Sequence, residues 1–366
     1  MQVCRISRTF VKSLKTYVGV HMRKTIVILS CISVLAAGCG QYRQFTNPVI
    51  DRDWPDPTVI YNPEDDHYYS VATGLNRAFM RSADLCEWED TGIYPFEKET
   101  VKTMKDLGPD VWAPQFAKIN GRYLIYVTLR SSAEDSRIAV LSSSTVTGPY
   151  KFENIVTDSG TTGIKDTIDP FAFVDEETGK TWLVFGSVGG IHQVELTGDG
   201  LALAEGAVYK HIAGQDIDRD GSRLTVFEGS YVYKRDGWWY LFASAGRYDD
   251  YSYAIVVGRS RNADGPFLNK DGKDMADGYG TTILASSPYD KFYGPGHNGE
   301  IFTDRNGDTF IFYHVHTGNY PFERTLASHN MRFTNLQRIY WDKDGWPYFR
   351  REEIAGGKIQ TKTKGI

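Results

Sequence analysis

Cysteine is scarce in this chain of 366 residues, which contains only four. Cys4, Cys31 and Cys39 lie near the N-terminus, and Cys86 stands alone in the body of the sequence. If the residues before Cys39 are removed and Cys39 is modified, Cys86 has no partner for an internal disulfide. A chain of this length can instead be stabilised by a large hydrophobic core.

Long apolar runs and an excess of positive charge are also missing. The apolar run at residues 26–37 is too short to cross a bilayer. Lys and Arg number 41 against 46 Asp and Glu, a formal net charge of -5, and this slightly acidic balance argues against a nucleic-acid partner. No stretch has the apolar pattern of a long amphipathic helix.

Aromatic residues and glycine, in contrast, are abundant. The chain has 23 Tyr, 19 Phe, 8 Trp and 36 Gly, a composition typical of short strands joined by tight turns. This predicts an all-β fold. Exposed aromatic rings also serve as stacking platforms in sugar-binding clefts, so the same composition is compatible with a carbohydrate ligand.

Positive charge precedes the apolar run, and small residues end it. The order Leu35-Ala36-Ala37-Gly38-Cys39 resembles the lipobox of bacterial lipoproteins. We therefore predict a start at Met22, a leader and signal peptide over residues 1–38, and a tether over residues 39–46 that is lipidated at Cys39. The protein would be an exported bacterial lipoprotein, anchored to the membrane by this lipid. The alternative is an ordinary signal peptide in which the cysteine is incidental.

A segment of turn residues, then aromatic and aliphatic residues, then a small residue recurs five times. The copies are residues 66–73, 120–127, 179–186, 236–243 and 306–313. Asn-Gly or Asp-Gly opens three of them, which is a strong hairpin signal. The spacing is similar except before the fifth copy, where residues 270–293 leave room for an insertion. These repeats predict a five-bladed β-propeller over residues 47–366 and argue against a β-sandwich.

Three acidic residues stand where turn chemistry alone does not explain them. Asp56, Asp169 and Glu228 each open the strand that precedes a repeated hairpin, in blades one, three and four. The innermost strands of a propeller start at one rim of the axial channel, so acids at equivalent positions would converge on one pocket. For a single Asp-Pro pair the alternative is a plain turn. Because burying an unpaired carboxylate is costly, the three together predict a functional site.

Every blade carries one short motif, and the five occur in a distinctive order. They are Asp56-Pro57, Trp112-Ala113-Pro114, Ile168-Asp169-Pro170, Glu228-Gly229 and Gly296-His297-Asn298. This ordered set resembles the signature of glycoside hydrolase family 43, over residues 47–349. The resemblance implies a five-bladed propeller enzyme that hydrolyses glycosidic bonds with inversion.

The resemblance also implies roles for individual residues. Asp56 would be the general base that activates water, and Glu228 the general acid that protonates the departing oxygen. Asp169 would be a pKa modulator that also orients its neighbour. His297 would hold a calcium ion near the channel axis, mostly through water. Trp112 would either stack on a sugar in substrate binding or pack within the fold.

Four stretches look like those of endo-acting α-1,5-L-arabinanases: residues 253–260, 280–282, 294–298 and 341–347. They predict plant cell-wall polysaccharide, arabinan or arabinoxylan, as the binding partner. The nearest alternative is an exo-acting α-L-arabinofuranosidase or β-xylosidase of the same family. The shape of the pocket mouth decides between them, because an open cleft admits a chain whereas a closed pocket admits a chain end.

Two alternative functions are less consistent with the sequence. A non-catalytic glycan-binding surface lipoprotein would be expected to have lost one of the three acids, and all three are present. A retaining enzyme of the invertase type would carry Asn-Asp-Pro-Asn-Gly, whereas this chain has Pro55-Asp56-Pro57-Thr58. By blade phase, Arg332 and His316 lie near the pocket, but no role is predicted for them.

Overall fold

The computed structural model describes residues 42–215, 225–317 and 331–360. The predicted start at Met22, the signal peptide and the lipidation site at Cys39 lie outside these residues and remain predictions. The chain divides into Met1–Tyr42 and one compact unit, Arg43–Ile366, and the sheets described here belong to the second unit.

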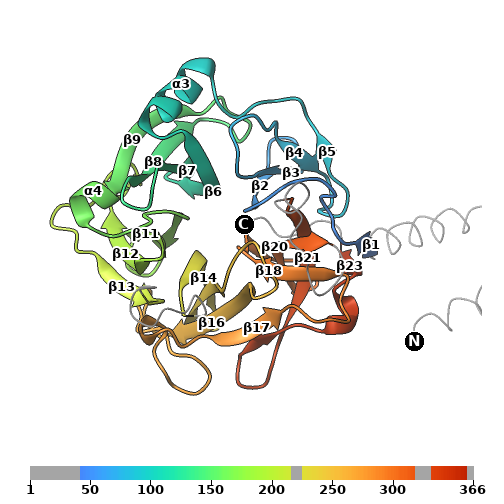
Figure 1. The fold of residues 1–366 in the computed structure, drawn as a ribbon. Coiled ribbons are helices and arrows are strands. Elements are labelled where there is room, and N and C mark those ends of the chain that lie inside the picture. Colours follow the sequence, from blue (N-terminus) through green and yellow to red (C-terminus); the bar gives the residue numbers. More distant parts are fainter. Residues whose placement is uncertain (1–41, 216–224, 318–330, 361–366) are drawn as a thin grey trace, which may run out of the picture. The chain divides into compact units, whose positions relative to one another are not determined.

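Five antiparallel sheets follow one another in sequence order around a common centre (Figure 1). In the first four sheets, strands that are consecutive in the chain lie side by side, as in a propeller blade, and in the fifth sheet both β18 and β19 pair with β20. In blades one to four the second strand coincides with a repeated segment, and in blade five the fifth segment coincides with β20, the strand that pairs with both β18 and β19. The prediction of an all-β, five-bladed β-propeller is therefore confirmed.

The blades are built from short strands. Blade one contains β2 (Thr58–Asn62), β3 (His67–Val71), β4 (Met80–Ser82) and β5 (Glu89–Asp90). Blade two contains β6 (Asp110–Ile119), β7 (Arg122–Arg130), β8 (Ser136–Ser143) and β9 (Lys151–Asp158). Blade three contains β10 (Phe171–Asp175), β11 (Lys180–Ser187), β12 (Gly190–Leu196) and β13 (Lys210–Ala213). Blade four contains β14 (Phe227–Arg235), β15 (Trp238–Ala245), β16 (Ala254–Ser260) and β17 (Thr281–Ala285). Blade five contains β18 (Phe292–Gly296), β19 (Ile301–Thr303), β20 (Thr309–Thr317), β21 (Phe333–Trp341) and β22 (Pro347–Tyr348).

Outside the blades, the described elements are short. β1 (Tyr42–Thr46) begins within the expected tether and pairs with β23 (Gly356–Gln360). The helical elements are α3 (Lys98–Leu107), α4 (Ser159–Thr162), η1 (Met275–Asp277) and η2 (Arg351–Glu353). Over the described ranges, no helix is long and apolar enough to span a membrane. Residues 270–293 are more than the expected insertion, because they supply β17, the fourth strand of blade four.

The hydrophobic core lies between neighbouring blades, and β7 shows why. Ile125 and Val127 belong to a buried cluster shared with blade one, whereas Leu124 and Tyr126 belong to a cluster shared with blade three. Successive side chains of a strand point to opposite faces of its sheet, so an all-apolar strand can fill two interfaces at once. This explains why the repeated segments are continuously aromatic and aliphatic rather than alternating with polar residues.

In every blade, one residue of the short motif has a left-handed backbone and lies next to or within the innermost strands. These residues are Asp56 (φ 52°), Ala113 (φ 42°), Asp169 (φ 57°), Gly229 (φ 58°) and His297 (φ 42°). A positive φ is uncommon for residues other than glycine and often marks a functional position. The five short motifs of the sequence therefore correspond to one structural position, repeated in each blade.

Candidate active site

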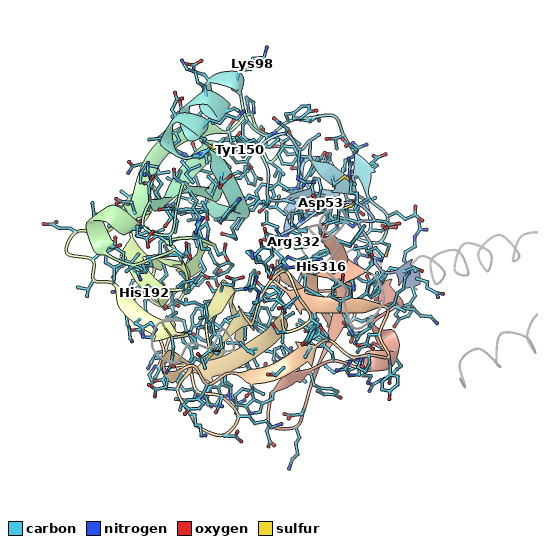
Figure 2. All side chains as sticks on the ribbon, in the orientation of Figure 1. Asp53, Lys98, Tyr150, His192, His316 and Arg332 are labelled. Carbon is cyan, nitrogen blue, oxygen red and sulfur yellow. The ribbon has the colours of Figure 1, made fainter. Side chains whose placement is uncertain are left out.

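A cavity of about 430 Å³ collects side chains from all five blades. Its lining residues are Asp56, Thr73, Trp112, Arg130, Asp166, Ile168, Asp169, Ser187, Val188, Glu228, Tyr248, His297 and Arg332. The structure thus brings together the five residues that the sequence predicted for catalysis, substrate binding and metal binding. Figure 2 labels Arg332 and His316 near the centre of the ring of blades.

One of the three acids departs from the predicted equivalence. Asp56 and Asp169 occupy the left-handed position of their blades, but in blade four this position is held by Gly229. Glu228 comes one residue earlier, where the β14–β15 register is interrupted between Glu228 and Tyr231. Glu228 therefore reaches the cavity from a strand position, whereas the two aspartates reach it from turns.

Asp56 is surrounded by nitrogen and hydroxyl groups. Its Oδ1 lies 2.6 Å from Nη1 of Arg332 and 3.2 Å from Nδ1 of both His297 and His314. Its Oδ2 accepts a hydrogen bond of 2.6 Å from Oγ1 of Thr73. Burial alone would raise the pKa of Asp56, but the positive charge of Arg332, followed by interactions with His297 and His314, outweighs burial and holds this pKa well below its usual range. Asp56 is therefore a carboxylate at neutral pH.

His314 is a neutral support for this carboxylate rather than an ionic partner. Its Nδ1 accepts the backbone N–H of Asp56 at 3.3 Å, so this nitrogen carries no proton. Burial, together with the charge of Arg332, lowers the pKa of His314 to about 3. The ring also stacks on Tyr253, with centroids 5.6 Å apart.

Glu228 is half-buried and held by two hydroxyl groups. Oγ of Ser187 donates to Oε2 at 2.7 Å, and the phenol of Tyr253 donates to Oε1 at 2.8 Å. Burial, followed by the nearby carboxylate charges, raises the pKa of Tyr253 well above its usual range, so the phenol keeps its proton. Asp56 is thus bound by a guanidinium, two imidazole nitrogens and one hydroxyl, whereas Glu228 is bound by hydroxyls.

Asp169 is buried beside both acids. Its backbone N–H donates to Oγ1 of Thr128 at 3.0 Å, and its Oδ2 accepts the N–H of Gly229 at 3.1 Å. Burial and then the charges of Glu228 and Asp56 raise the pKa of Asp169 well above its usual range. Asp169 therefore keeps a proton to a higher pH than an exposed aspartate.

Two aromatic rings and their arginines form part of the cavity wall. The guanidinium of Arg130 lies 4.9 Å from the ring centroid of Trp112, and that of Arg332 lies 5.1 Å from the ring of Tyr248. Tyr248 is 46% exposed, and Trp112 is half-buried. A guanidinium on one face leaves the other face of such a ring available for stacking.

Arg332 and His316 contact different parts of the site. Arg332 pairs with Asp56, as described, whereas Nε2 of His316 lies 2.8 Å from the carbonyl oxygen of Tyr248. The ring of His316 stacks on Tyr293, with centroids 5.3 Å apart. His316 therefore supports the loop that carries Tyr248.

The sequence analysis missed the residues that hold the acids and the left-handed turns, although a signal was present. They are Thr73, Thr128, Ser187, Ser244 and His314, each at the end of a repeated segment or directly after it. Four of them accept the backbone N–H of the left-handed residue in the next blade, and Ser187 donates to Glu228 instead. A hydrogen-bonding side chain at the same place in all five copies is the pattern that could have revealed them.

Comparison with known proteins agrees with this geometry. The family model described as glycosyl hydrolases family 43 matches residues 45–347. An arabinan endo-1,5-alpha-L-arabinosidase C of Emericella nidulans is 31% identical, over 84% of this chain and 96% of that protein. An extracellular exo-alpha-(1->5)-L-arabinofuranosidase of Cellvibrio japonicus is 26% identical, over 89% and 93%.

A solved structure shares the fold of the whole propeller. The alpha-L-arabinanase of Cellvibrio cellulosa, which is also known in complex with arabinohexaose, superposes with a TM-score of 0.69 at 25% identity. The match covers 82% of this chain and 96% of that one. With one motif in each blade and three acids in one cavity, the chain belongs to glycosyl hydrolases family 43 and is a glycoside hydrolase.

Proposed function

We propose that this protein hydrolyses α-1,5-linked L-arabinan by endo-acting cleavage with inversion, in the degradation of plant polysaccharide. The observation that carries the proposal is the contrast between Asp56 and Glu228 within one cavity. Asp56 is kept ionised by Arg332, as a base must be. Glu228 is held by hydroxyl groups, which can stay in place whether the carboxyl group is protonated or not.

The two acids would act on opposite sides of the scissile bond. The Asp56 carboxylate accepts a proton from a water molecule as that water attacks the anomeric carbon, while Glu228 donates its proton to the departing sugar oxygen. Both acids are restored when protons exchange with solvent. Buried Asp169 would orient Glu228 from the neighbouring blade, and burial and the nearby carboxylates raise its own pKa.

Arabinan is proposed because a fungal relative is named an arabinan endo-1,5-alpha-L-arabinosidase and a bacterial relative is named an exo-alpha-(1->5)-L-arabinofuranosidase. Trp112 and Tyr248 would supply the stacking surfaces for its furanose rings. The exo-acting alternative has support among the relatives, because one of them is named as an exo-enzyme.

Product analysis separates these possibilities. The protein is incubated with linear arabinan, branched arabinan, xylan and aryl glycosides, and early products are resolved by size. A ladder of arabino-oligosaccharides is expected. A single small product from the first minutes would identify exo action. Activity on xylosides alone would show that xylan, and not arabinan, is the substrate. No turnover of any substrate would contradict the proposal that the protein hydrolyses glycosides.

We also propose that a calcium ion binds near His297 as a cofactor. Ser230 Oγ and Asn298 Oδ1 are buried without hydrogen-bond partners among the described residues, and both line a small cavity beside His297. Unpartnered oxygens suit calcium, which prefers oxygen ligands. Nowhere in the described ranges do three or more His, Cys, Asp or Glu residues form a metal cluster. The residues present therefore fit an ion that would be held largely through water.

Export with a lipid anchor at Cys39 is a further part of the proposal. Two relatives are named as extracellular enzymes, which supports export. The anchor itself rests on the order of residues that ends at Cys39. Replacing Cys39 with Ser should release the protein from the membrane fraction, and continued membrane association of Cys39→Ser would reject the anchor.

A further inference from the structure

The general base Asp56 depends on two donors from distant parts of the chain. Thr73, which follows β3, donates to Oδ2, and Arg332, which precedes β21, donates to Oδ1. Both contacts are 2.6 Å long. The position of the carboxylate therefore depends on how firmly these two segments are held against each other.

One guanidinium group links the supports of both donors. Nε of Arg77 donates to the carbonyl oxygen of Thr73 at 2.7 Å. Nη2 of Arg77 lies 2.6 Å from Oδ2 of Asp53, and Nη1 donates to the backbone carbonyl of the same residue. The other oxygen of Asp53 accepts the backbone N–H of Arg332 at 3.0 Å. The Arg77 side chain thus links the two segments that position Asp56. It bonds to the Thr73 segment directly, and it reaches the Arg332 segment through Asp53.

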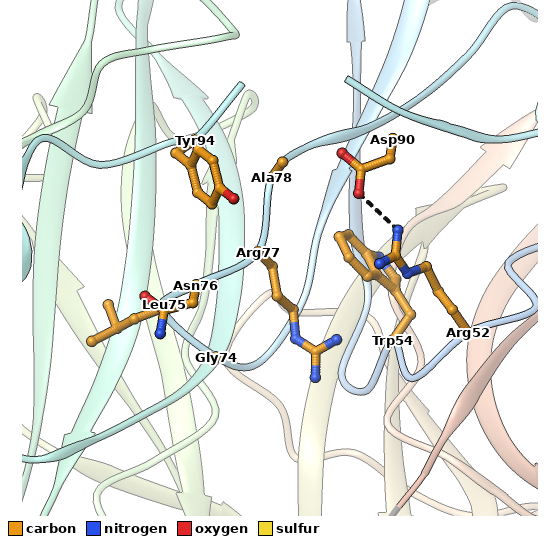
Figure 3. Close-up of a pocket in the computed structure, with 9 residues that line it drawn as sticks. All are labelled: Arg52, Trp54, Gly74, Leu75, Asn76, Arg77, Ala78, Asp90 and Tyr94. Carbon is orange, nitrogen blue, oxygen red and sulfur yellow. Dashed lines mark hydrogen bonds and ion pairs between the residues drawn. The ribbon is translucent and has the colours of Figure 1, made fainter. Parts of the chain in front are cut away.

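The guanidinium of Arg77 lies beside Trp54 (Figure 3). It lies 5.7 Å from the ring centroid of Trp54, which is 2% exposed. At Gly74, whose φ is +115°, a Cβ atom would stand 3.1 Å from Nε of Arg77, so glycine leaves the path of the side chain clear. Arg77 lines a second cavity of about 420 Å³, on whose other side Arg52 pairs with Asp90.

We propose that Arg77 is a positioning residue for the general base, because it holds Thr73 and, through Asp53, Arg332 against the Asp56 carboxylate. This inference rests on the proposed role of Asp56. The arginine fork is needed, since its three nitrogens donate in fixed directions to acceptors on two segments. Lysine would supply the charge but not this geometry.

The ionisation of Asp56 provides a readout that a merely structural role would not change. The groups facing it are Arg332 before β21, His297 after β18, His314 in β20 and the buried Asp169 of blade three. Among these, Arg332 carries a permanent positive charge. If Arg332 moves away, Asp56 takes up a proton at higher pH, and the acidic limb of the pH–rate profile moves upward.

The test compares Arg77→Ala, Arg77→Lys and Arg52→Ala on arabinan. Arg77→Ala should lower kcat about 10- to 100-fold with little change in KM, because a small displacement of a catalytic group can cost this much. Its acidic limb should move to higher pH, and Arg77→Lys should recover only part of both effects. Arg52→Ala, which lines the same cavity but pairs with Asp90, should behave like the wild type.

The outcomes separate this inference from the proposed function. If Asp56→Ala is inactive but Arg77→Ala keeps the wild-type kcat and pH profile, the positioning role is wrong while the catalytic assignment stands. If Asp56→Ala is active, the proposed function itself fails. An equal loss in Arg52→Ala, or a change confined to KM, would also overturn the positioning role. If circular dichroism shows Arg77→Ala to be unfolded, the pH profile of Arg77→Lys decides in the same way.

Discussion

The phenol of Tyr253 donates a hydrogen bond of 2.8 Å to Oε1 of Glu228, and it does so from a fully buried position directly before β16. The same ring stacks on His314, whose Nδ1 accepts the backbone N–H of Asp56. Tyr253 therefore contacts Glu228, the proposed general acid, directly, and its ring contacts His314, which supports Asp56, the proposed general base. A change at its hydroxyl and a change at its ring should have different consequences.

Tyr253→Phe removes only the hydroxyl and keeps the stacked ring. We expect kcat on arabinan to fall about 10-fold, because a hydrogen bond to a charged or charge-developing group contributes about 1.5–3 kcal/mol. Activity on aryl glycosides with good leaving groups should fall less, since they need little help from the acid. Tyr126→Phe is the control, because this buried phenol bonds to the carbonyl oxygen of Gly200 in the blade two–three interface. Equal losses in the two variants would contradict a role for Tyr253 at Glu228.

The fold could be predicted from the sequence because the repeated segments are local and strongly patterned. Asn120-Gly121 and Asp236-Gly237 both adopt positive φ, as their hairpin turns require, and apolar strands follow each of them. Helix α3 was not predicted. Its residues Lys98–Leu107 contain three lysines or acids in the first half alone, and only Thr100 and Met104 are buried, so its apolar pattern is weak.

The acids could be predicted, but most of their partners could not. Asp56 stands in a recognisable motif, whereas Arg332 reaches it from a distant segment of the chain with no motif of its own. Thr73 and Ser187 look like ordinary residues at strand ends, because small polar residues are common there. Their roles depend on blade geometry, which places the end of one second strand beside the innermost strand of the next blade.

Glu300 predicts how stability depends on pH. It joins blade five to blade one, accepting from Oγ1 of Thr58 at 2.7 Å and from the backbone N–H of Val59. Burial raises the pKa of Glu300 from 4.5 to about 7 despite these bonds. Its raised folded pKa means that the folded state binds a proton more tightly than the unfolded state, so the stability it contributes is fully present below about pH 4.5 and is lost as pH rises through about 7.

Replacing Glu300 with Gln should therefore make the decrease in stability with rising pH smaller. The difference in Tm between Glu300→Gln and the wild type should become more favourable to the variant from pH 5 to pH 8, because the amide cannot ionise. Thermal unfolding across this range is the measurement. A constant difference in Tm at every pH would show that Glu300 does not titrate in this window.

Calcium removal tests the ion proposed beside His297. A chelator should lower activity or Tm, because the ion would stabilise the folded state by binding to it. His297→Ala should cause a similar loss, and the chelator should then have no further effect. If the chelator has no effect on the wild type and His297→Ala behaves like the wild type, the proposed calcium site is wrong.

Asp169→Asn tests the third carboxyl group. Burial and the charges of Glu228 and Asp56 raise the pKa of Asp169, so it becomes ionised only as pH rises above its usual range. A negative charge beside a second carboxyl group makes that group harder to ionise. The asparagine variant cannot develop the charge, so the basic limb of its pH–rate profile should move to lower pH. An unchanged basic limb would restrict Asp169 to a structural role.

The assignment of base and acid is tested most directly by removing each of them. Asp56→Ala loses the group that accepts the proton from water, so turnover should be abolished on every substrate. Glu228→Ala loses the proton donor, so it should cripple hydrolysis of arabinan by about 100-fold or more while sparing aryl glycosides whose leaving group needs no proton. For an inverting pair, the two carboxyl groups should stand about 6.5–9.5 Å apart, which leaves room for the water between base and sugar. Rates for both variants on both substrate types, with the anomer of the first product followed by NMR, make the measurement. Retention of configuration, or equal loss of both substrates in Glu228→Ala, would mean that Asp56 and Glu228 do not play these two roles.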